Sequence, residues 1–270
     1  MGIRLLVCGG RDFLDIDFVT KVLCTVHELY KIDTIIEGDA PGADRLAKLW
    51  SEEVIGPSES YPADWKRYGK QAGMLRNKQM LDQGMPDAVL AFPGWKGTAN
   101  MIEQSRCVQH LPIWVINKIL FRKEDPKLGY LSNFDTRFPI IINNISWKSV
   151  EHFYQAMKNE DLSYQNTVRR APTPNKAKHL GNNVPLRTDW ENIKMNVMRI
   201  ALEEKFKKNS EAAKLLGCTG INYLIEYAPW RDSFWGMYYD PRGNLVGNNH
   251  LGKLLMERRY HLFGMKEYFQ

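Results

Sequence analysis

Residues 131–158 read LSNFDTRFPIIINNISWKSVEHFYQAMK, and this stretch places an asparagine turn, a short apolar strand and a helix in direct succession. The apolar residues of the helix fall on one face and are expected to be core. Four polar residues are spaced i, i+3, i+4 and i+7 and therefore share another face: Glu151, Tyr154, Gln155 and Lys158. Such a row is too polar for a buried seam and indicates a functional site. The alternative is a solvated face with a Glu–Lys pair.

Further motifs follow along the second half of the chain: APTPNKAKHLG (171–181), Trp190, KF (205–206), RDSFWG (231–236) and GNNHLGKLLMERR (247–259). Together with SNF (132–134) and VEHFYQAMK (150–158), in this order and spacing, they resemble the NADAR family over residues 117–259. The resemblance implies a small α-rich domain that cleaves N-glycosidic bonds to ribose. Some members act on a riboflavin-pathway intermediate, and others remove ADP-ribose from guanine bases.

Cleavage of a ribose–base N-glycosidic bond develops positive charge at the anomeric carbon and negative charge on the leaving base. A carboxylate below the sugar, a proton source at the base and a positioned water suffice, so we expect neither a metal nor a cofactor. We interpret Glu151 as the carboxylate because it begins the polar face; the alternative is a glutamate favoured there by the helix dipole. The catalytic residues implied by the resemblance are Glu151, Lys158, Asp232 and Trp190.

The other three catalytic candidates each have an alternative. Asp232 would orient substrate or act as an acid or base, or else pair with Arg231. Lys158 would bind a phosphate, or its amine would attack a ring-opened ribose as a Schiff base. Trp190 would stack on a base or pack in the core. The residues expected to bind substrate, with turn bracing as the alternative for the two asparagines, are Asn133, Phe134, Tyr154, Gln155, Trp235 and Asn249.

Length and composition suit two domains, which we predict at residues 1–117 and 118–270. No run approaches about 18 apolar residues, and the N-terminus enters a strand directly, so we expect neither a membrane span nor a signal peptide. Four scattered cysteines, and six histidines without ligand spacing, favour reduced thiols in the cytoplasm and no bound metal.

Charge is uneven along the chain. Residues 1–117 hold 13 basic against 15 acidic residues, a net of −2, and residues 118–270 hold 24 against 16, a net of +8. The basic excess therefore lies in the second half, where it would attract the phosphates of a nucleotide or of nucleic acid. The alternative is a generally basic, soluble surface.

Residues 1–117 alternate short apolar runs with helical periods, which predicts an α/β fold with a doubly wound, Rossmann-like parallel sheet. Glycine-rich segments follow three of the strands: CGGRDF (8–13), EGDAPGAD (37–44) and FPGWKGTAN (92–100). Glycines let backbone N–H groups approach a phosphate at this edge, although tight turns need glycine in any case. The expected nucleotide contacts are Gly9, Gly10, Arg11, Gly38, Asp39, Arg76, Asn77, Gly94, Gly97 and Thr98.

These segments, with PADW (62–65) and AGMLRN (72–77), resemble the SLOG superfamily of Rossmann-like nucleotide-binding domains. The LOG enzymes of that superfamily cleave nucleotide N-glycosidic bonds with an arginine and the glutamate of PGGxGTxxE. Here Trp95 stands where the second glycine is usual, and Met101 replaces the glutamate. Without that carboxylate nothing stabilises oxocarbenium charge or activates water, so we predict a binding or sensing module and not a second hydrolase.

Three functions remain open. The first is an N-glycosidase that acts on an ADP-ribosylated base or a related NAD-derived nucleotide, which a cell would use to reverse ADP-ribosylation and a virus to counter a host defence. The second is a metabolic N-glycosidase of the riboflavin-intermediate type. The third is a silent binder that sequesters an NAD-derived signal. The expected partners are an ADP-ribose-containing nucleotide or ADP-ribosylated nucleic acid, a regulatory nucleotide at the N-terminal domain, and a second copy of the chain.

Overall fold

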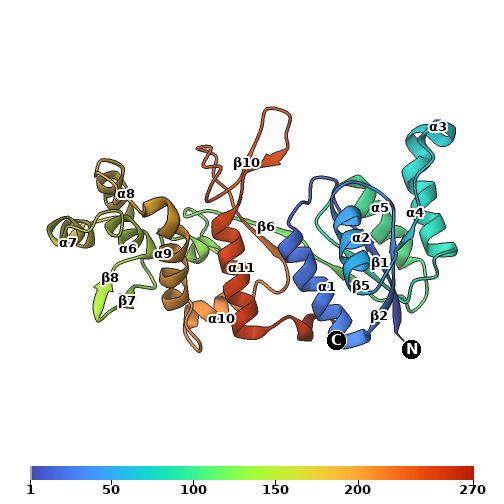
Figure 1. Ribbon diagram of the computed structural model, residues 1–270, viewed down its shortest axis with the longest axis horizontal. Coiled ribbons are helices and arrows are strands. Elements are labelled where there is room, and N and C mark those ends of the chain that lie inside the picture. The colour runs from blue at the N-terminus through green and yellow to red at the C-terminus, as the bar shows by residue number, and fades with distance from the viewer. Residues whose placement is uncertain (1) are drawn as a thin grey trace. The chain divides into compact units, whose positions relative to one another are not determined.

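The computed structural model describes residues 2–270, and Figure 1 shows its helices and strands. The chain forms two compact units. The first comprises the residues up to Lys118 together with Met265–Gln270, and the second is Ile119–Gly264. Within the described residues, no helix is both long enough and apolar enough to cross a membrane.

The first unit is built on a five-stranded sheet in the order β3-β2-β1-β4-β5, and every pairing in it is parallel. The predicted doubly wound α/β fold is confirmed. The strands are β1 (Ile3–Cys8), β2 (Ile32–Glu37), β3 (Glu59–Ser60), β4 (Ala88–Ala91) and β5 (Ile113–Val115). β1 and β4 are apolar and buried at the centre of the sheet, as expected for strands covered on both faces.

Five helices lie in the crossovers of this sheet: α1 (Ile16–Tyr30), α2 (Ala43–Val54), α3 (Trp65–Tyr68), α4 (Ala72–Asp82) and α5 (Lys96–Arg106). α1 packs against α2, and α4 packs against α5. The short α3, followed by the 3-10 turn η1 (Gly69–Gln71), was not predicted, because its four residues are too few to show a helical period. Met101 of α5 is fully buried in the core.

The last residues of the chain pack against the first unit. The backbone carbonyl of Phe269 accepts a hydrogen bond from the Tyr30 hydroxyl, and the Phe269 ring packs edge-on to Trp114 with 5.3 Å between ring centres. The turn η3 (Lys266–Tyr268) adds an ion pair of 3.1 Å between Lys266 and Glu28. The second unit therefore differs from the predicted residues 118–270 at Lys118 and in the last six residues.

The second unit is rich in helices, as predicted. They are α6 (Val150–Ala156), α7 (Leu162–Arg170), α8 (Pro174–Asn182), α9 (Trp190–Lys205), α10 (Glu211–Gly217) and α11 (His250–Phe263), with the turn η2 (Gly129–Leu131). Its three two-stranded sheets pair β6 (Lys118–Phe121) with β9 (Tyr223–Glu226), β7 (Ile140–Ile142) with β8 (Ile145–Trp147), and β10 (Tyr238–Tyr239) with β11 (Leu245–Val246).

Helix α6 lies at the centre of this unit and packs against α7, α8 and α9. Ser149 caps its N-terminus by accepting a hydrogen bond from the His152 N–H, and all seven residues of the helix are buried. The helix ends at Ala156, so Lys158 lies in the turn that follows and not on the helix as predicted. The polar face is therefore enclosed by neighbouring helices, and the alternative of a solvated face is wrong.

Candidate functional site

The carboxylate of Glu151 is buried and held by two amides. The Asn133 side chain donates to Oε2, and the Gln155 side chain donates to Oε1 at 2.7 Å. The Glu151 N–H also donates to the Asn133 carbonyl at 2.9 Å, which joins the turn to the helix. Burial raises the pKa of Glu151, while the bond from Gln155 and the charges of Lys178, Lys158 and Lys123 oppose that rise.

The two amide oxygens beside this carboxylate are open acceptors. Asn133 Oδ1 and Gln155 Oε1 are both buried, and within residues 2–270 neither has a hydrogen-bond partner. An unsatisfied buried acceptor is costly unless a ligand or water supplies a donor. Asn133 thus holds Glu151 with its amide nitrogen, while its amide oxygen is buried without a donor.

Lys205, at the end of α9, fixes the turn that carries Asn133. Its buried ammonium donates to the Ser132 carbonyl at 2.7 Å and lies 3.8 Å from the carboxylate of Asp135. Burial lowers the pKa of Lys205 to about 7, against the opposing charge of Asp135. The KF motif in the sequence contains this residue, but its role emerges only from these contacts.

A second buried carboxylate, Glu226, closes β9. Its residue is 7% exposed, and within residues 2–270 its side chain forms no hydrogen bond or ion pair. The pKa of Glu226 is raised to about 8, chiefly by burial and also by the charges of Asp232 and Glu151, while the charge of Lys178 opposes the rise. Glu226 is absent from the site residues predicted from the sequence. The available signal was a charged residue that ends an otherwise apolar strand, YLIE.

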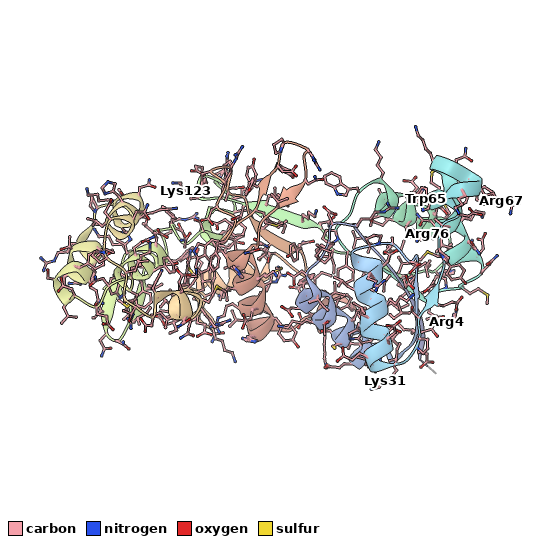
Figure 2. The ribbon with its side chains drawn as sticks, turned by 45° about the horizontal axis from the view of Figure 1, so that its top comes forward. Arg4, Lys31, Trp65, Arg67, Arg76 and Lys123 are labelled. Carbon is pink, nitrogen blue, oxygen red and sulfur yellow. The ribbon has the colours of Figure 1, made fainter. Side chains whose placement is uncertain are left out.

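Glu226 lies in the wall of a cavity of about 100 Å³, whose other lining residues are Lys123, Ser132, Phe134, Asn175, Lys178 and Trp230. The Lys123 ammonium lies 4.7 Å from the centre of the Phe134 ring (Figure 2 labels Lys123), and that of Lys178 lies 5.6 Å from the same ring. Trp230 is half exposed, and its ring centre is 5.9 Å from the Lys178 ammonium. The ammonium groups of Lys123 and Lys178 and the rings of Phe134 and Trp230 therefore line the same cavity as the carboxyl group of Glu226.

Phe134 is the predicted site residue that lines this cavity, and Glu151 and the other predicted residues of this unit are not among the lining residues. Trp190 is only 4% exposed and packs edge-on to Tyr154, with 5.0 Å between ring centres. Trp235 packs edge-on to the same ring at 5.4 Å. Burial raises the pKa of Tyr154. Trp190 is therefore buried and packed against Tyr154, and its predicted stacking on a base stays a prediction.

The remaining predicted side chains contact the backbone. Asp232 Oδ1 accepts hydrogen bonds from the N–H groups of Phe234 and Trp235, at 3.1 and 2.9 Å, and so shapes this loop. Lys158 donates to the Gly181 carbonyl at 3.2 Å, and burial lowers the pKa of its amine. The backbone of Asn249 lies in the left-handed region, with φ at 54°. Its side chain braces neighbouring backbone, which is the alternative to substrate binding for this residue.

Asn249 connects the start of α11 to the strand that ends in Glu226. Its side-chain oxygen accepts from the Glu226 N–H at 3.1 Å, and its nitrogen donates to the Leu224 carbonyl at 2.8 Å. The residue is 1% exposed, so both bonds are shielded from water. Asn249 therefore positions Glu226 without facing the cavity itself.

The first unit contains a larger cavity, of about 530 Å³, at the carboxyl edge of its sheet. Seven of the predicted nucleotide contacts line it: Gly9, Gly10, Arg11, Arg76, Asn77, Gly97 and Thr98. Gly38, Asp39 and Gly94 are not among the lining residues. A Cβ at Gly94 would overlap the Thr98 hydroxyl, and a Cβ at Gly38 would overlap the Arg76 guanidinium. These two glycines permit close packing behind the cavity wall.

Both charged and aromatic side chains line this cavity. Arg76 donates to the Gly38 carbonyl and lies 3.6 Å from the buried carboxylate of Asp44. Burial raises the pKa of Asp44 to about 6 although Arg76 opposes the rise. At the rim, Trp65 and Trp95 are 50% and 57% exposed, and the Arg11 guanidinium lies 5.4 Å from the Trp65 ring centre (Figure 2 labels Trp65 and Arg76).

Neither unit brings metal ligands together: within residues 2–270, no group of three or more His, Cys, Asp or Glu side chains is arranged to hold a metal ion. The four cysteines are free thiols. Cys8 lies in the core of the first unit, where burial raises the pKa of its thiol.

Two family models match the chain. The NADAR domain model matches residues 120–263, and the model of the YspA, cpYpsA-related SLOG family matches residues 3–68. The N-glycosidase YbiA of Shigella flexneri serotype 5b is 39% identical over 146 residues, which cover 53% of this chain and 88% of that protein. The Riboflavin biosynthesis protein VVA0006 of Vibrio vulnificus is 36% identical over 148 residues, which cover 53% of this chain and 38% of that protein. The NMR structure of E. coli YbiA superposes with a TM-score of 0.47 at 37% identity, over 53% of this chain and 83% of that one.

Proposed function

Because this chain belongs to the NADAR domain family, we propose that its second unit hydrolyses the N-glycosidic bond between the ribose of an ADP-ribose group and a nucleobase. Its relatives named N-glycosidases support a hydrolase of N-glycosyl bonds. The observation that carries the proposal is the buried Glu151 carboxylate, which two amides orient and whose charge is acted on by Lys123 and Lys178, two residues that line the cavity.

Glu151 would stabilise the positive charge that develops on the ribose and accept a proton from the attacking water. Its amide donors hold the carboxylate in one orientation, which removes a reorganisation cost from the transition state. The charges of Lys178, Lys158 and Lys123 favour its ionised form against the effect of burial.

An ADP-ribose substrate suits the charge of the cavity. Lys123 and Lys178 offer two ammonium groups to a diphosphate, and Phe134 and Trp230 offer rings on which a base can stack. The excess of basic residues in the second half of the chain supports a polyphosphate or nucleic-acid substrate over a monophosphate. In a cell this activity would reverse ADP-ribosylation in the cytoplasm, and in a virus it would counter a host defence.

The alternative is a metabolic N-glycosidase, which is favoured by the relative named Riboflavin biosynthesis protein. A direct test compares ADP-ribosylated guanine DNA, ADP-ribosyl guanosine and the riboflavin-pathway intermediate as substrates, with products identified by mass spectrometry. We expect guanosine, or DNA with guanine restored, together with ADP-ribose. Turnover of the riboflavin intermediate alone would support the alternative. Binding without turnover of any of the three would support a sequestering protein.

The role of Glu151 is tested in the same assay. Glu151→Gln keeps the shape of the side chain and should lower turnover by at least about 10²-fold, the scale of one positioned catalytic group. Glu160→Gln is a matched control, because Glu160 is an exposed glutamate of the same unit. A Glu151→Gln variant that turns over at the wild-type rate would limit Glu151 to a structural role.

We also propose that the first unit binds a phosphate-bearing nucleotide without hydrolysing it. The cavity at the sheet edge has four cationic side chains in its lining, from Arg11, Lys70, Arg76 and Lys96, and two exposed tryptophans. Met101, which replaces the catalytic glutamate of LOG enzymes, is buried in the core. Calorimetry of the full chain with ADP-ribose, NAD, AMP and cyclic nucleotides tests binding, and its loss in Arg11→Ala assigns it to this cavity.

A further inference from the structure

We infer that Glu226 is the general acid that protonates the departing base, whereas Glu151 is the base that accepts a proton from the attacking water. This inference rests on the proposed N-glycosidase activity and adds a residue to it. The carboxyl group of Glu226 lines the cavity, and within residues 2–270 its side chain has no partner. A buried carboxyl group without donors is stable chiefly in its neutral form, which is the form that can give up a proton.

The two carboxyl groups lie in contrasting surroundings. Glu151 accepts hydrogen bonds from the amides of Asn133 and Gln155, which favour its ionised form. Glu226 has no such donors, and the groups that act on its charge are Lys178, Asp232 and Glu151. The pKa of Glu226, raised to about 8, keeps it protonated at neutral pH. Burial raises the pKa of both carboxyl groups, and the two amide donors of Glu151 are what favour it as the base and Glu226 as the proton donor.

The backbone holds Glu226 in place without using its side chain. Asn249 accepts from the Glu226 N–H, and the Glu226 carbonyl accepts from the Met237 N–H at 2.8 Å. The carboxyl group is therefore carried on a fixed strand end toward the cavity, where Phe134 and Trp230 offer a base two rings to stack on. A base held there would present a ring nitrogen or carbonyl oxygen to the acid.

The reaction then balances with water as the only co-reactant. The bond between the anomeric carbon and the base nitrogen breaks, and its electron pair goes to the base, which takes the proton of Glu226. Water forms the new bond to the anomeric carbon and gives a proton to the Glu151 carboxylate. Glu151 is then neutral and Glu226 ionised, and exchange with solvent restores both for the next turnover.

Kinetics with two leaving groups test the assignment. Glu226→Gln in the full chain should lower kcat on ADP-ribosyl guanosine by at least about 10²-fold. It should change kcat by less than threefold on an ADP-ribose nitrophenyl glycoside, because nitrophenolate leaves without a proton. Equal losses on both substrates, or wild-type activity on the guanosine, would overturn the inference. The wild-type alkaline decrease in kcat/KM should disappear in Glu226→Gln and persist in Glu160→Gln.

A measurement without substrate separates this inference from the proposed function. Infrared difference spectra of wild type against Glu226→Gln should contain the carbonyl band of a protonated carboxylic acid at pH 7, and that band should disappear as pH rises above 8. A carboxylate band at pH 7 would overturn the inference whatever the enzyme cleaves. Failure of wild type to cleave any substrate, with the protonated band present, would refute the proposed reaction and leave Glu226 as a neutral hydrogen-bond donor to a ligand.

Discussion

The burial of Glu226 has a consequence for stability that is independent of catalysis. Its pKa rises from an ordinary 4.5 to about 8, chiefly because burial disfavours the charged carboxylate. The folded state therefore binds more protons than the unfolded state between these two values. As a result, the contribution of Glu226 to the free energy of unfolding is fully present below pH 4.5 and is lost as pH rises through 8.

The size of this effect follows from the two pKa values. With about 1.4 kcal/mol for each unit of pKa difference, and partial titration at both ends, the loss between pH 5 and pH 8 is about 3 kcal/mol. Glu226→Gln has no proton to release in this range, so its stability should lack that decrease. The variant should gain about 3 kcal/mol relative to wild type as pH rises from 5 to 8.

Urea unfolding at pH 5, 6, 7 and 8 measures this difference. Hydrogen exchange of peptides from β9 and α11 follows the second unit separately, which matters because the chain has two units that can unfold in different steps. Glu160→Gln serves as the control and should keep the wild-type dependence on pH. Parallel curves for wild type and Glu226→Gln would refute the reasoning, since they would mean that Glu226 is ionised in the folded protein.

Three further predictions concern residues that position the sites. Asn249→Ala should destabilise the second unit by about 2–3 kcal/mol in urea unfolding, because two buried backbone groups of β9 lose their partner; a change below about 0.5 kcal/mol would contradict this. Lys205→Met should cost about 1–3 kcal/mol and lower kcat, since it leaves the buried Ser132 carbonyl without its donor and Asp135 with Arg137 as its remaining cation, and an unchanged kcat would show that the Asn133 turn holds its place unaided. Trp65→Ala should weaken nucleotide binding to the first unit by about 1–3 kcal/mol in calorimetry if the base stacks there, whereas equal affinity would place the base elsewhere.

Local patterns in the sequence predict much of the fold. The apolar runs of the first half mark its strands, and periods of 3.6 residues mark the helices of its crossovers, because each of these signals depends on neighbours within a few positions. The glycine-rich segments at the ends of β1, β2 and β4 predict the edge where the cavity lies, since the carboxyl ends of parallel strands meet there. The short α3 has no such signal.

The sequence by itself determined which side chains share the face of α6, because helical spacing places Glu151 and Gln155 one turn apart. Only the tertiary structure decided that this face is enclosed, that Trp190 packs against Tyr154, and that Glu226 joins Glu151 from 75 positions further along the chain. Burial and long-range pairing depend on how helices and strands pack, and periodicity within one segment carries no information about the segment that will cover it. The pKa of a carboxyl group follows from that covering, so the division of labour proposed for the two glutamates is a property of the folded chain.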